Sequence, residues 1–586
     1  MSVPGAAPER DEARVRAVEE TYARIAAADD PAIFVSLAPV GHACDRAVAA
    51  TGPLAGWTLA VKDNVDVAGL PTTAACPPFA YTPAGSACAV ERLERAGAVV
   101  VGKANLDQFA TGLVGTRSPY GAPRNPADPA LVPGGSSSGS AVAVARGLVR
   151  VALGTDTAGS GRVPAACTGI VGLKPTPGAV SVRGVVPAVP GADCVSVFAR
   201  TVADAWAVLD ACRGPDPLDP WSRAPRGSDA AAPARPDVVL LAGAESACEP
   251  SVRSGYELAC TALAGFAGSL TEVAPDAFDE AGALLYDPAF VAARRVAFGE
   301  VLAAHRSTPG AVDPVVARVV LDGPVARATD VHRARVALAE CRRRAREALG
   351  HADALVVPTV PRVPTLAEVA ADPVGVNAGL GRFTQFVNLL GMCAATVPVP
   401  APGGRPASVT VVGRAGDDAL VATLAFRLQR ALGTAGAEGP PAAGPPEVRL
   451  AVVGAHLRGQ PLHADLLALG ARFETRTRTA ACYRLYALAG TRPPRPGLVR
   501  VARDGAPVEV EVYRIDPAGL GTLVGTVPAP LCIGKVELAD GATVTGFLCE
   551  AHATAGAIDI TSYGGWRAYL ADAPAGVPQS VGAVRR

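Results

Sequence analysis

The chain has 586 residues, of which 49% are hydrophobic and 18% charged, and its formal net charge at pH 7 is zero. This length exceeds one ordinary compact core, so we expect two or three domains. The balanced charge argues against a nucleic-acid binder, which would carry a basic face or stripe. The charged N-terminus lacks the apolar stretch of a secretory signal, and no uninterrupted run of about 18 apolar residues predicts a membrane span. We therefore expect a globular protein of the cytoplasm.

The cysteines and histidines do not have the spacing of metal ligands. The 13 cysteines are odd in number and scattered, without a C-x-x-C pair, and the seven histidines have no H-E-x-x-H or similar spacing. Cysteines used in this way indicate buried free thiols in a reducing compartment. The sequence therefore predicts neither a disulfide framework nor a metal site.

The cations are almost all arginine, and the lysines are Lys62, Lys103, Lys174 and Lys535. Arginine keeps its proton in a protein, whereas a buried lysine can lose it. A retained lysine is therefore a candidate for a role that needs a neutral amine. Chance or packing is the alternative, which we favour for Lys535, and for Lys103 we expect a surface or loop position.

Strand and helix patterns alternate along the first three quarters of the chain. Residues 1–50 predict peripheral helices, and residues 250–350 predict helices with arginine-rich amphipathic stretches. Further strands are expected at 57–61, 98–101, 353–360 and 408–413, and helices at 87–95, 141–148 and 417–431. This alternation predicts an α/β fold with a mixed central sheet covered by helices.

A composition change marks the clearest domain boundary. Residues 433–446 (GTAGAEGPPAAGPP) are almost entirely Gly, Ala and Pro, which predicts an exposed, semi-rigid linker. We therefore expect one domain at 1–432 and a second, smaller, strand-rich domain at 447–586.

Two glycine-rich loops carry the strongest local signals. Residues 134–140 (GGSSSGS) open a predicted helix, and residues 154–164 (GTDTAGSGRVP) follow 20 positions later. The first loop alone fits a flexible linker or a phosphate loop, but the lysine of a P-loop is missing. The glycines of the second loop allow consecutive N–H groups to point at one spot.

Together with Lys62 in LAVKDN and with GLKPT at 172–176, these loops resemble the motifs of the amidase signature family. The resemblance covers about residues 20–430. It implies a Ser-cisSer-Lys triad in which Ser160 is the nucleophile, Ser136 the bridging serine and Lys62 the base. Ser136 precedes Ser160 by 24 residues, as in that family.

This triad also makes chemical sense. A serine hydroxyl is a weak nucleophile and needs a base, which a desolvated neutral lysine can supply. A serine between the two can relay the proton, because its hydroxyl both donates and accepts. Asp156 and Arg162 are expected to hold the loop in shape. An oxyanion hole, worth about 3 kcal/mol per donor, is expected from the N–H groups of Thr157, Ala158, Gly159 and Ser160.

Several segments, among them 63–76 and 104–121, are more similar to the allophanate hydrolases of that family than to its other members. The resemblance of residues 286–294 (YDPAFVAAR) implies that Tyr286 and Arg294 hold the substrate. Allophanate is a carboxylated urea, and a guanidinium can bind its carboxylate with two parallel hydrogen bonds. The alternative for Arg294 is a solvated charge on a helix face, since Arg295 adjoins it.

Segments of 447–586 resemble the additional domain of allophanate hydrolases, which implies a smaller α+β domain of γ-glutamylcyclotransferase-like fold. In related enzymes this domain is implicated in decarboxylating the first product, with a histidine that corresponds to His456. Either form of its imidazole is expected to be available near pH 7. A buried structural histidine is the alternative.

Two segments depart from the family's pattern. Residues 380–386 read LGRFTQF, with Phe383 and Gln385 where relatives usually have Tyr and Asn, and residues 189–192 read VPGA where relatives carry larger or charged residues. If either segment lines the pocket, the substrate assignment stays open.

The resemblance as a whole implies an enzyme that converts allophanate to ammonia and carbon dioxide without metal, nucleotide or biotin. A biotin site between methionines is not expected, because the methionines are Met1 and Met392. We expect a separate urea carboxylase, or enzymes of cyanurate and biuret breakdown, to supply the small-molecule substrate, and a homodimer stays open. The alternatives are a general small-amide amidase, the A-type subunit of a tRNA-dependent amidotransferase, and a non-catalytic scaffold.

Overall fold

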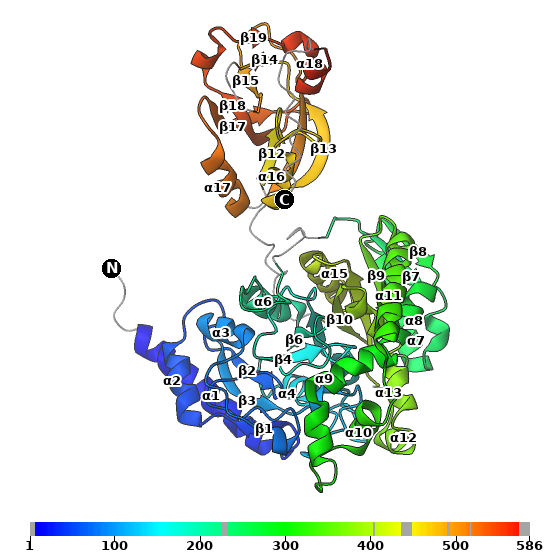
Figure 1. Cartoon of the computed structure of the whole chain (residues 1–586). Helices are drawn as coiled ribbons and strands as arrows, with labels where there is room; N and C mark the ends of the chain where they lie inside the picture. The colour runs from blue at the N-terminus through cyan, green and yellow to red at the C-terminus, as the bar shows by residue number, and fades with distance from the viewer. Residues whose placement is uncertain are drawn as a thin grey trace. The chain divides into compact units, whose positions relative to one another are not determined.

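A mixed eleven-stranded sheet forms the first of two units, Met1–Ala443, and two smaller sheets form the second, Gly444–Arg586 (Figure 1). The computed structural model describes residues 6–223, 232–401, 405–434, 448–488, 493–515 and 517–572. Most of the predicted linker at 433–446 therefore lies outside the described residues.

The strand order of the large sheet is β1-β3-β2-β4-β6-β5-β10-β11-β9-β7-β8. Strand β2 is parallel to β3 and β4, and β7 is parallel to β8 and β9, while the other neighbours are antiparallel. The strands are β1 Phe34–Leu37, β2 Thr58–Lys62, β3 Val99–Ala104, β4 Val151–Asp156, β5 Val171–Lys174, β6 Cys194–Ala199, β7 Asp237–Leu241, β8 Ser269–Val273, β9 Ala354–Pro358, β10 Cys393–Val399 and β11 Ala407–Gly413.

The helices of this unit are α1 Ala6–Ala27, α2 Val40–Ala49, α3 Cys88–Arg95, α4 Ser138–Ala145, α5 Val163–Thr168, α6 Val202–Cys212, α7 Pro250–Ala264, α8 Asp276–Ala283, α9 Pro288–His305, α10 Pro314–Leu321, α11 Ala328–Leu349, α12 Leu366–Ala371, α13 Gly375–Leu380, α14 Gln385–Leu389 and α15 Asp418–Ala431. Short 3₁₀ turns include η2 Gln108–Ala110 and η4 Leu284–Tyr286.

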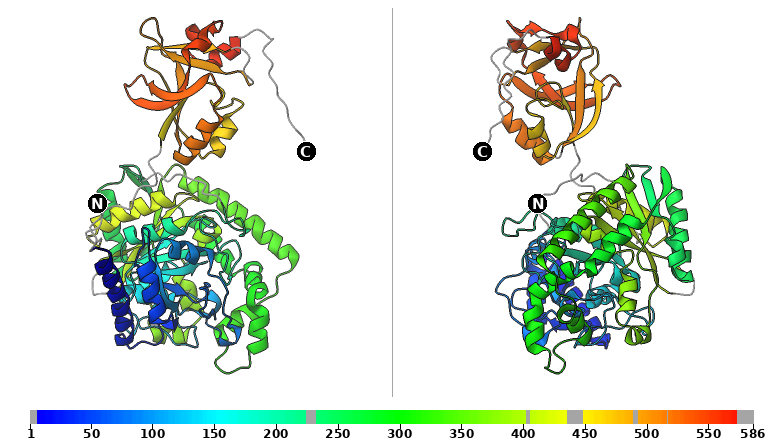
Figure 2. Two further views of the ribbon diagram at one scale, coloured as in Figure 1. Left: turned by 90° about the vertical axis from the view of Figure 1, so that its left-hand side faces the viewer. Right: turned by 45° about the vertical axis from the view of Figure 1, so that its right-hand side comes forward.

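Helices pack on both faces of the sheet. The largest hydrophobic cluster joins the strands to α3, α6, α7 and α15, and a separate cluster joins β2, β3 and β4 to α4 and α5. Helices α1 and α2 pack against β3 near one sheet edge (Figure 2). The central strands are buried along their whole length, which is typical of a sheet covered on both sides. The predicted α/β fold with a mixed, helix-covered sheet is confirmed.

Lys103 does not lie at the surface, so that expectation is wrong. It belongs to β3, between β1 and β2, and its side chain is fully buried. Its Nζ atom lies 3.2 Å from Oδ1 of Asp63 and donates to Oγ1 of Thr72 at 2.9 Å. A buried ammonium needs such a charged partner, and the apolar run of β3 concealed it in the sequence.

The second unit is smaller and rich in strands, as expected, and has its own hydrophobic cluster. One sheet has the order β13-β16-β12-β18-β17 and the other β15-β14-β19. Its elements are β12 Val448–Val452, α16 His463–Ala468, β13 Arg472–Arg478, β14 Tyr483–Ala487, β15 Pro496–Arg500, β16 Glu509–Ile515, α17 Pro517–Thr526, β17 Leu531–Glu537, β18 Thr543–Cys549, β19 Ile558–Asp559 and α18 Trp566–Asp572.

The 13 cysteines are free thiols, nine of them buried, in agreement with the sequence analysis. None of the helices in the described part of the chain has the length and apolar character that a membrane span requires.

Candidate active site

Lys62 ends strand β2 and is fully buried. Its Nζ donates to Oγ of Ser136 and to Oγ1 of Thr155, both at 2.7 Å. Burial lowers the pKa of Lys62 to about 7, although the nearby carboxylates of Asp107, Asp156 and Asp193 act in the opposite direction. A neutral amine in contact with a serine hydroxyl is therefore available near neutral pH.

The Ser136 loop leads into α4, and its Gly135–Ser136 peptide bond is cis. A side chain at Gly135 would bring a Cβ within 2.0 Å of Oδ2 of Asp107, so only glycine fits there. The backbone N–H of Asp107 donates to the Ser136 carbonyl at 2.9 Å. The next residue, Ser137, donates its hydroxyl to the carbonyl of Thr155 at 3.2 Å. These contacts bring the first glycine-rich loop beside the second.

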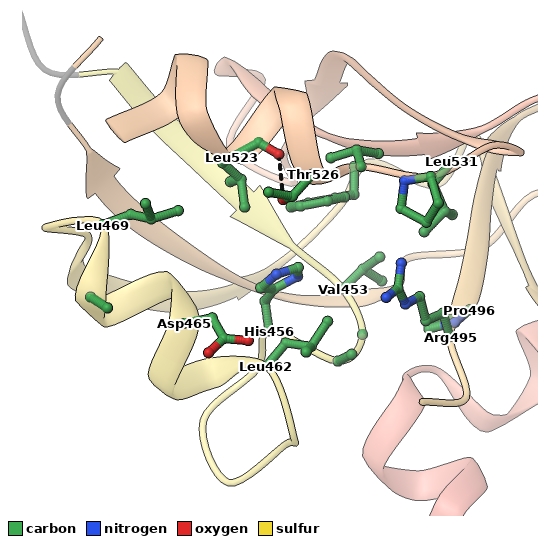
Figure 3. Close-up of a pocket in the computed structure, with 16 residues that line it drawn as sticks. Val453, His456, Leu462, Asp465, Leu469, Arg495, Pro496, Leu523, Thr526 and Leu531 are labelled. Atoms are coloured by element: carbon green, nitrogen blue, oxygen red, sulfur yellow. Dashed lines mark hydrogen bonds between the residues drawn. The ribbon is translucent and has the colours of Figure 1, made fainter. Parts of the chain in front are cut away.

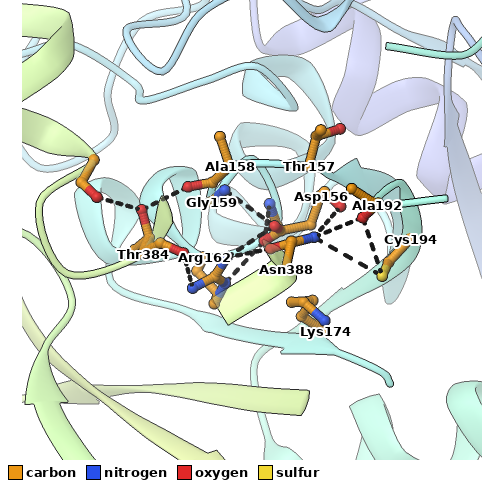
Figure 4. A network of polar contacts seen from close by, with 12 residues as sticks. Asp156, Thr157, Ala158, Gly159, Arg162, Lys174, Ala192, Cys194, Thr384 and Asn388 are labelled. Atoms are coloured by element: carbon orange, nitrogen blue, oxygen red, sulfur yellow. Dashed lines mark hydrogen bonds and ion pairs between the residues drawn. The ribbon is translucent and has the colours of Figure 1, made fainter. Parts of the chain in front are cut away.

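The second loop connects β4 to α5 around an ion pair between Asp156 and Arg162 (Figure 4). Nε and Nη2 of Arg162 donate to the two carboxylate oxygens of Asp156, each at 2.9 Å. Arg162 also donates to the Thr384 carbonyl and to Oδ1 of Asn388, both at 2.9 Å. The expected structural role of Asp156 and Arg162 is borne out. Ser160 lies in this loop and is 2% exposed.

The oxyanion donors differ from the expectation at one position. The N–H of Gly159 donates to Oδ1 of Asp156 at 3.0 Å, so this group is already engaged in holding the loop. Among the described residues, the N–H groups of Thr157, Ala158 and Ser160 have no hydrogen-bond partner. Gly159 has φ +137°, and a Cβ there would lie 2.3 Å from Oγ1 of Thr384. Its function is therefore conformational, and three donors remain for an oxyanion.

Tyr286 and Arg294 lie on consecutive elements, η4 and α9. The Tyr286 hydroxyl accepts from Nδ2 of Asn377 at 3.2 Å and from Nε2 of Gln385 at 3.4 Å. Since Gln385 follows Thr384, whose hydroxyl donates to the Ala158 carbonyl at 2.8 Å, Tyr286 is linked to the second glycine-rich loop, 154–164, the proposed nucleophile loop. Segment 380–386, which differs from the family's pattern, thus contacts Tyr286, a residue predicted to bind the substrate.

Arg294 is not a solvated helix charge, because it is only 5% exposed, and its Nε and Nη1 have no hydrogen-bond partner. Burial lowers the pKa of Arg294, whereas Tyr286 and Asp193 act to raise it. Its neighbour Arg295 instead donates to the carbonyls of Val320 and Leu321 at 2.9 and 3.0 Å. The two adjacent arginines therefore have different surroundings, and only Arg294 has buried donors to offer a ligand.

Three contributors to this site were missed in the sequence. Thr155 receives the second hydrogen bond of Lys62, and Asn377 donates to Tyr286 while its Oδ1 accepts from the Leu113 N–H at 2.7 Å. Asp193 accepts from the hydroxyl of Thr157 at 2.5 Å. One signal was available for Asp193, since it is the only charged residue between Arg183 and Arg200.

His456 lies in the second unit, in a pocket of about 350 Å³ (Figure 3). Its ring stacks on Phe547 at 5.0 Å between centroids, and Asp465 and Arg495 also line the pocket. Burial, and then the charge of Arg495, lower the pKa of His456 to about 4. The expectation that a charged imidazole is available near pH 7 is therefore wrong, and the neutral ring is the form present.

Comparisons with known proteins agree with the resemblance. The sequence matches the Amidase family over residues 16–422 and the allophanate hydrolase C-terminal domain over residues 448–571. It is 40% identical over 551 residues to the urea amidolyase of Lachancea kluyveri, an alignment that covers 88% of this chain and 30% of that protein. The chain thus spans about a third of the length of such relatives.

A solved structure, the allophanate hydrolase of Kluyveromyces lactis, is 37% identical and superimposes with a TM-score of 0.70 over 95% of this chain and 97% of the other. A glutamyl-tRNA(Gln) amidotransferase subunit from Symbiobacterium thermophilum is 35% identical over 407 residues, which cover 65% of this chain and 83% of that protein. The chain therefore belongs to the amidase family and carries the C-terminal domain of allophanate hydrolases.

Proposed function

We propose that this chain hydrolyses allophanate, through Lys62, Ser136 and Ser160. The observation that carries the substrate assignment is Arg294, a buried guanidinium with two N–H-bearing nitrogens that lack partners. Buried donors of this kind are costly unless a ligand or water satisfies them. The carboxylate of allophanate matches a guanidinium in charge and geometry. Tyr286, linked to the nucleophile loop, is proposed to contact the same substrate.

The proposed reaction begins with neutral Lys62. It takes a proton from Ser136, which in turn takes the proton of Ser160 as the Ser160 oxygen attacks the amide carbonyl carbon of the substrate. The carbonyl oxygen becomes an oxyanion and accepts from the N–H groups of Thr157, Ala158 and Ser160. Each such donor contributes about 3 kcal/mol in comparable sites.

Collapse of this intermediate breaks the carbon–nitrogen bond. The leaving nitrogen receives the proton that Lys62 holds, through Ser136, and departs as ammonia. Water then attacks the acyl-enzyme with the same relay as its base and frees Ser160. The product carries two carboxylates on one nitrogen, and its loss of carbon dioxide yields a second ammonia in the overall reaction.

The loss of carbon dioxide is the step that we propose for the pocket of the second unit. His456 and Arg495 both point into this pocket in Figure 3. A neutral imidazole offers one donor and one acceptor, and Arg495 supplies the positive charge that a dianionic product requires. His456 is proposed to orient that product.

One assay separates allophanate from other amides. Ammonia release by the purified chain is measured with allophanate, biuret, malonamide and glutamine side by side. We expect allophanate to have the highest kcat/KM. A preference for malonamide or biuret would support a general amidase instead. A preference for glutamine would support the activity that the name of the amidotransferase relative describes.

A further inference from the structure

Asp193 lies directly before strand β6 and is 7% exposed. Antiparallel pairing of β4 with β6 sets Asp156 opposite Cys194, so the residues that come next beyond the two strands, Thr157 and Asp193, meet at the end of this strand pair. Oδ1 of Asp193 accepts from the Thr157 hydroxyl, and Oδ2 accepts from the N–H groups of Ala188 and Val189, both at 3.0 Å. The carboxylate therefore joins the nucleophile loop to the 188–193 turn.

Asp193 also lies within the electrostatic reach of two functional side chains. Its charge acts on Lys62, together with Asp107 after β3 and Asp156 at the end of β4. It acts on Arg294 of α9 as well, together with Tyr286 of η4. Among the described residues, Asp193 and Arg294 do not form an ion pair within 4 Å, so Nε and Nη1 of Arg294 stay without a hydrogen-bond partner.

We propose that Asp193 is a positioning residue of this site. It fixes the nucleophile loop through Thr157, and its negative charge favours the protonated form of Lys62 and opposes the binding of an anionic substrate to Arg294. The part that concerns the anion rests on the function proposed above. A neutral residue of the same shape would bind allophanate more tightly but would lose part of the electrostatic control over Lys62.

The substitution Asp193→Asn tests this charge with little change of shape. The amide oxygen accepts from Ala188 and Val189, and the amide nitrogen donates to the Thr157 hydroxyl, which accepts as well as donates. Without the negative charge, the ammonium of Lys62 is less stable. We expect the acidic limb of the kcat/KM profile to move to lower pH by about one unit.

The substrate pair for this test is allophanate and biuret, which differ only by a carboxylate against a neutral carboxamide. We expect Asp193→Asn to lower KM for allophanate by about threefold or more relative to KM for biuret. Simple structural damage would raise both KM values and leave the acidic limb in position. An unchanged limb together with an unchanged KM ratio overturns the proposal.

Asp219→Asn is the matched control, because Asp219 is also buried and its carboxylate accepts from Ser181, Val182 and Trp221 rather than from Thr157. It is expected to leave the acidic limb unmoved.

If Asp193→Asn does not fold, Thr157→Val tests the same contact. In that variant kcat should fall equally for both substrates, and a wild-type kcat overturns the proposal. Absence of allophanate hydrolysis by the wild type would reject the proposed function, while the acidic limb measured with biuret still tests Asp193.

Discussion

At the scale of single residues, Lys62 determines how activity depends on pH. Its pKa is lowered from the usual value of a lysine to about 7, chiefly by burial. The protonated amine below this pH cannot accept a proton, and the neutral amine above it can. We therefore expect kcat/KM for allophanate to rise with pH through about 7, measured as an initial-rate pH profile.

Two lysine-to-arginine substitutions control this prediction. Lys62→Arg should be as inactive as Lys62→Ala, several orders of magnitude below wild type, because arginine stays charged. Lys535→Arg, at an exposed position of β17, should keep wild-type activity. An active Lys62→Arg enzyme, or a profile that is flat between about pH 6 and 8, would contradict the proton relay.

Arg294 determines which amide is bound, and its neighbour provides the control. Arg294→Gln removes a buried guanidinium, so KM for allophanate should rise by about 100-fold, while KM for biuret changes less. Arg295→Gln removes a side chain that bonds to α10 carbonyls, and both substrates should be affected equally. Equal losses on the two substrates for Arg294→Gln would count against carboxylate binding.

At the scale of elements, the hydrophobic pattern predicts four of the eleven strands of the large sheet, β2, β3, β9 and β11, and the helices α3, α4 and α15. The strand predicted at 57–61 is β2, and the helix predicted at 417–431 is α15. The helix predicted from 141 to 148 begins earlier, at Ser138, because the small residues of the first loop continue into it. Strand β8 was missed within 250–350 because it is a half-exposed edge strand without an apolar run.

The nucleophile loop gives the prediction that belongs to this scale. Gly159→Ala would drive a Cβ against the Thr384 hydroxyl, so the loop must shift and kcat should fall by about 100-fold or more. Gly169→Ala is the matched control, since Gly169 also has a positive φ but faces open space at the end of α5. It should cost about 1 kcal/mol of stability and leave kcat unchanged.

At the scale of the whole molecule, the sequence indicated the α/β fold and the strand-rich second unit, and it supplied the residues of the proposed triad, because each of these has a local signature. Contacts between segments that are distant in the sequence have no such local signature. Asn377 meets Tyr286 across 91 residues, and the link between Asp193 and Thr157 depends on strand pairing that no motif encodes. The sequence likewise did not reveal that Arg495, directly before β15, lines the same pocket as His456.

The separation of the two units leads to the last prediction. The hydrophobic clusters of the described residues each lie within one unit, and the proposed triad lies wholly in the first. We therefore expect the fragment 1–432 to fold alone and to release the first ammonia from allophanate. Because the pocket of His456 is missing from it, the dicarboxylated product should accumulate instead of carbon dioxide.

Two full-length variants make the same test without truncation. His456→Ala should leave the release of the first ammonia unchanged and slow the release of carbon dioxide by about tenfold or more. His463→Ala, in α16 but outside the residues that line the pocket, should do neither. Product analysis over time distinguishes the outcomes. If His456→Ala and the fragment both yield carbon dioxide at the wild-type rate, the pocket does not serve the second step, and a structural function of the second unit is preferred.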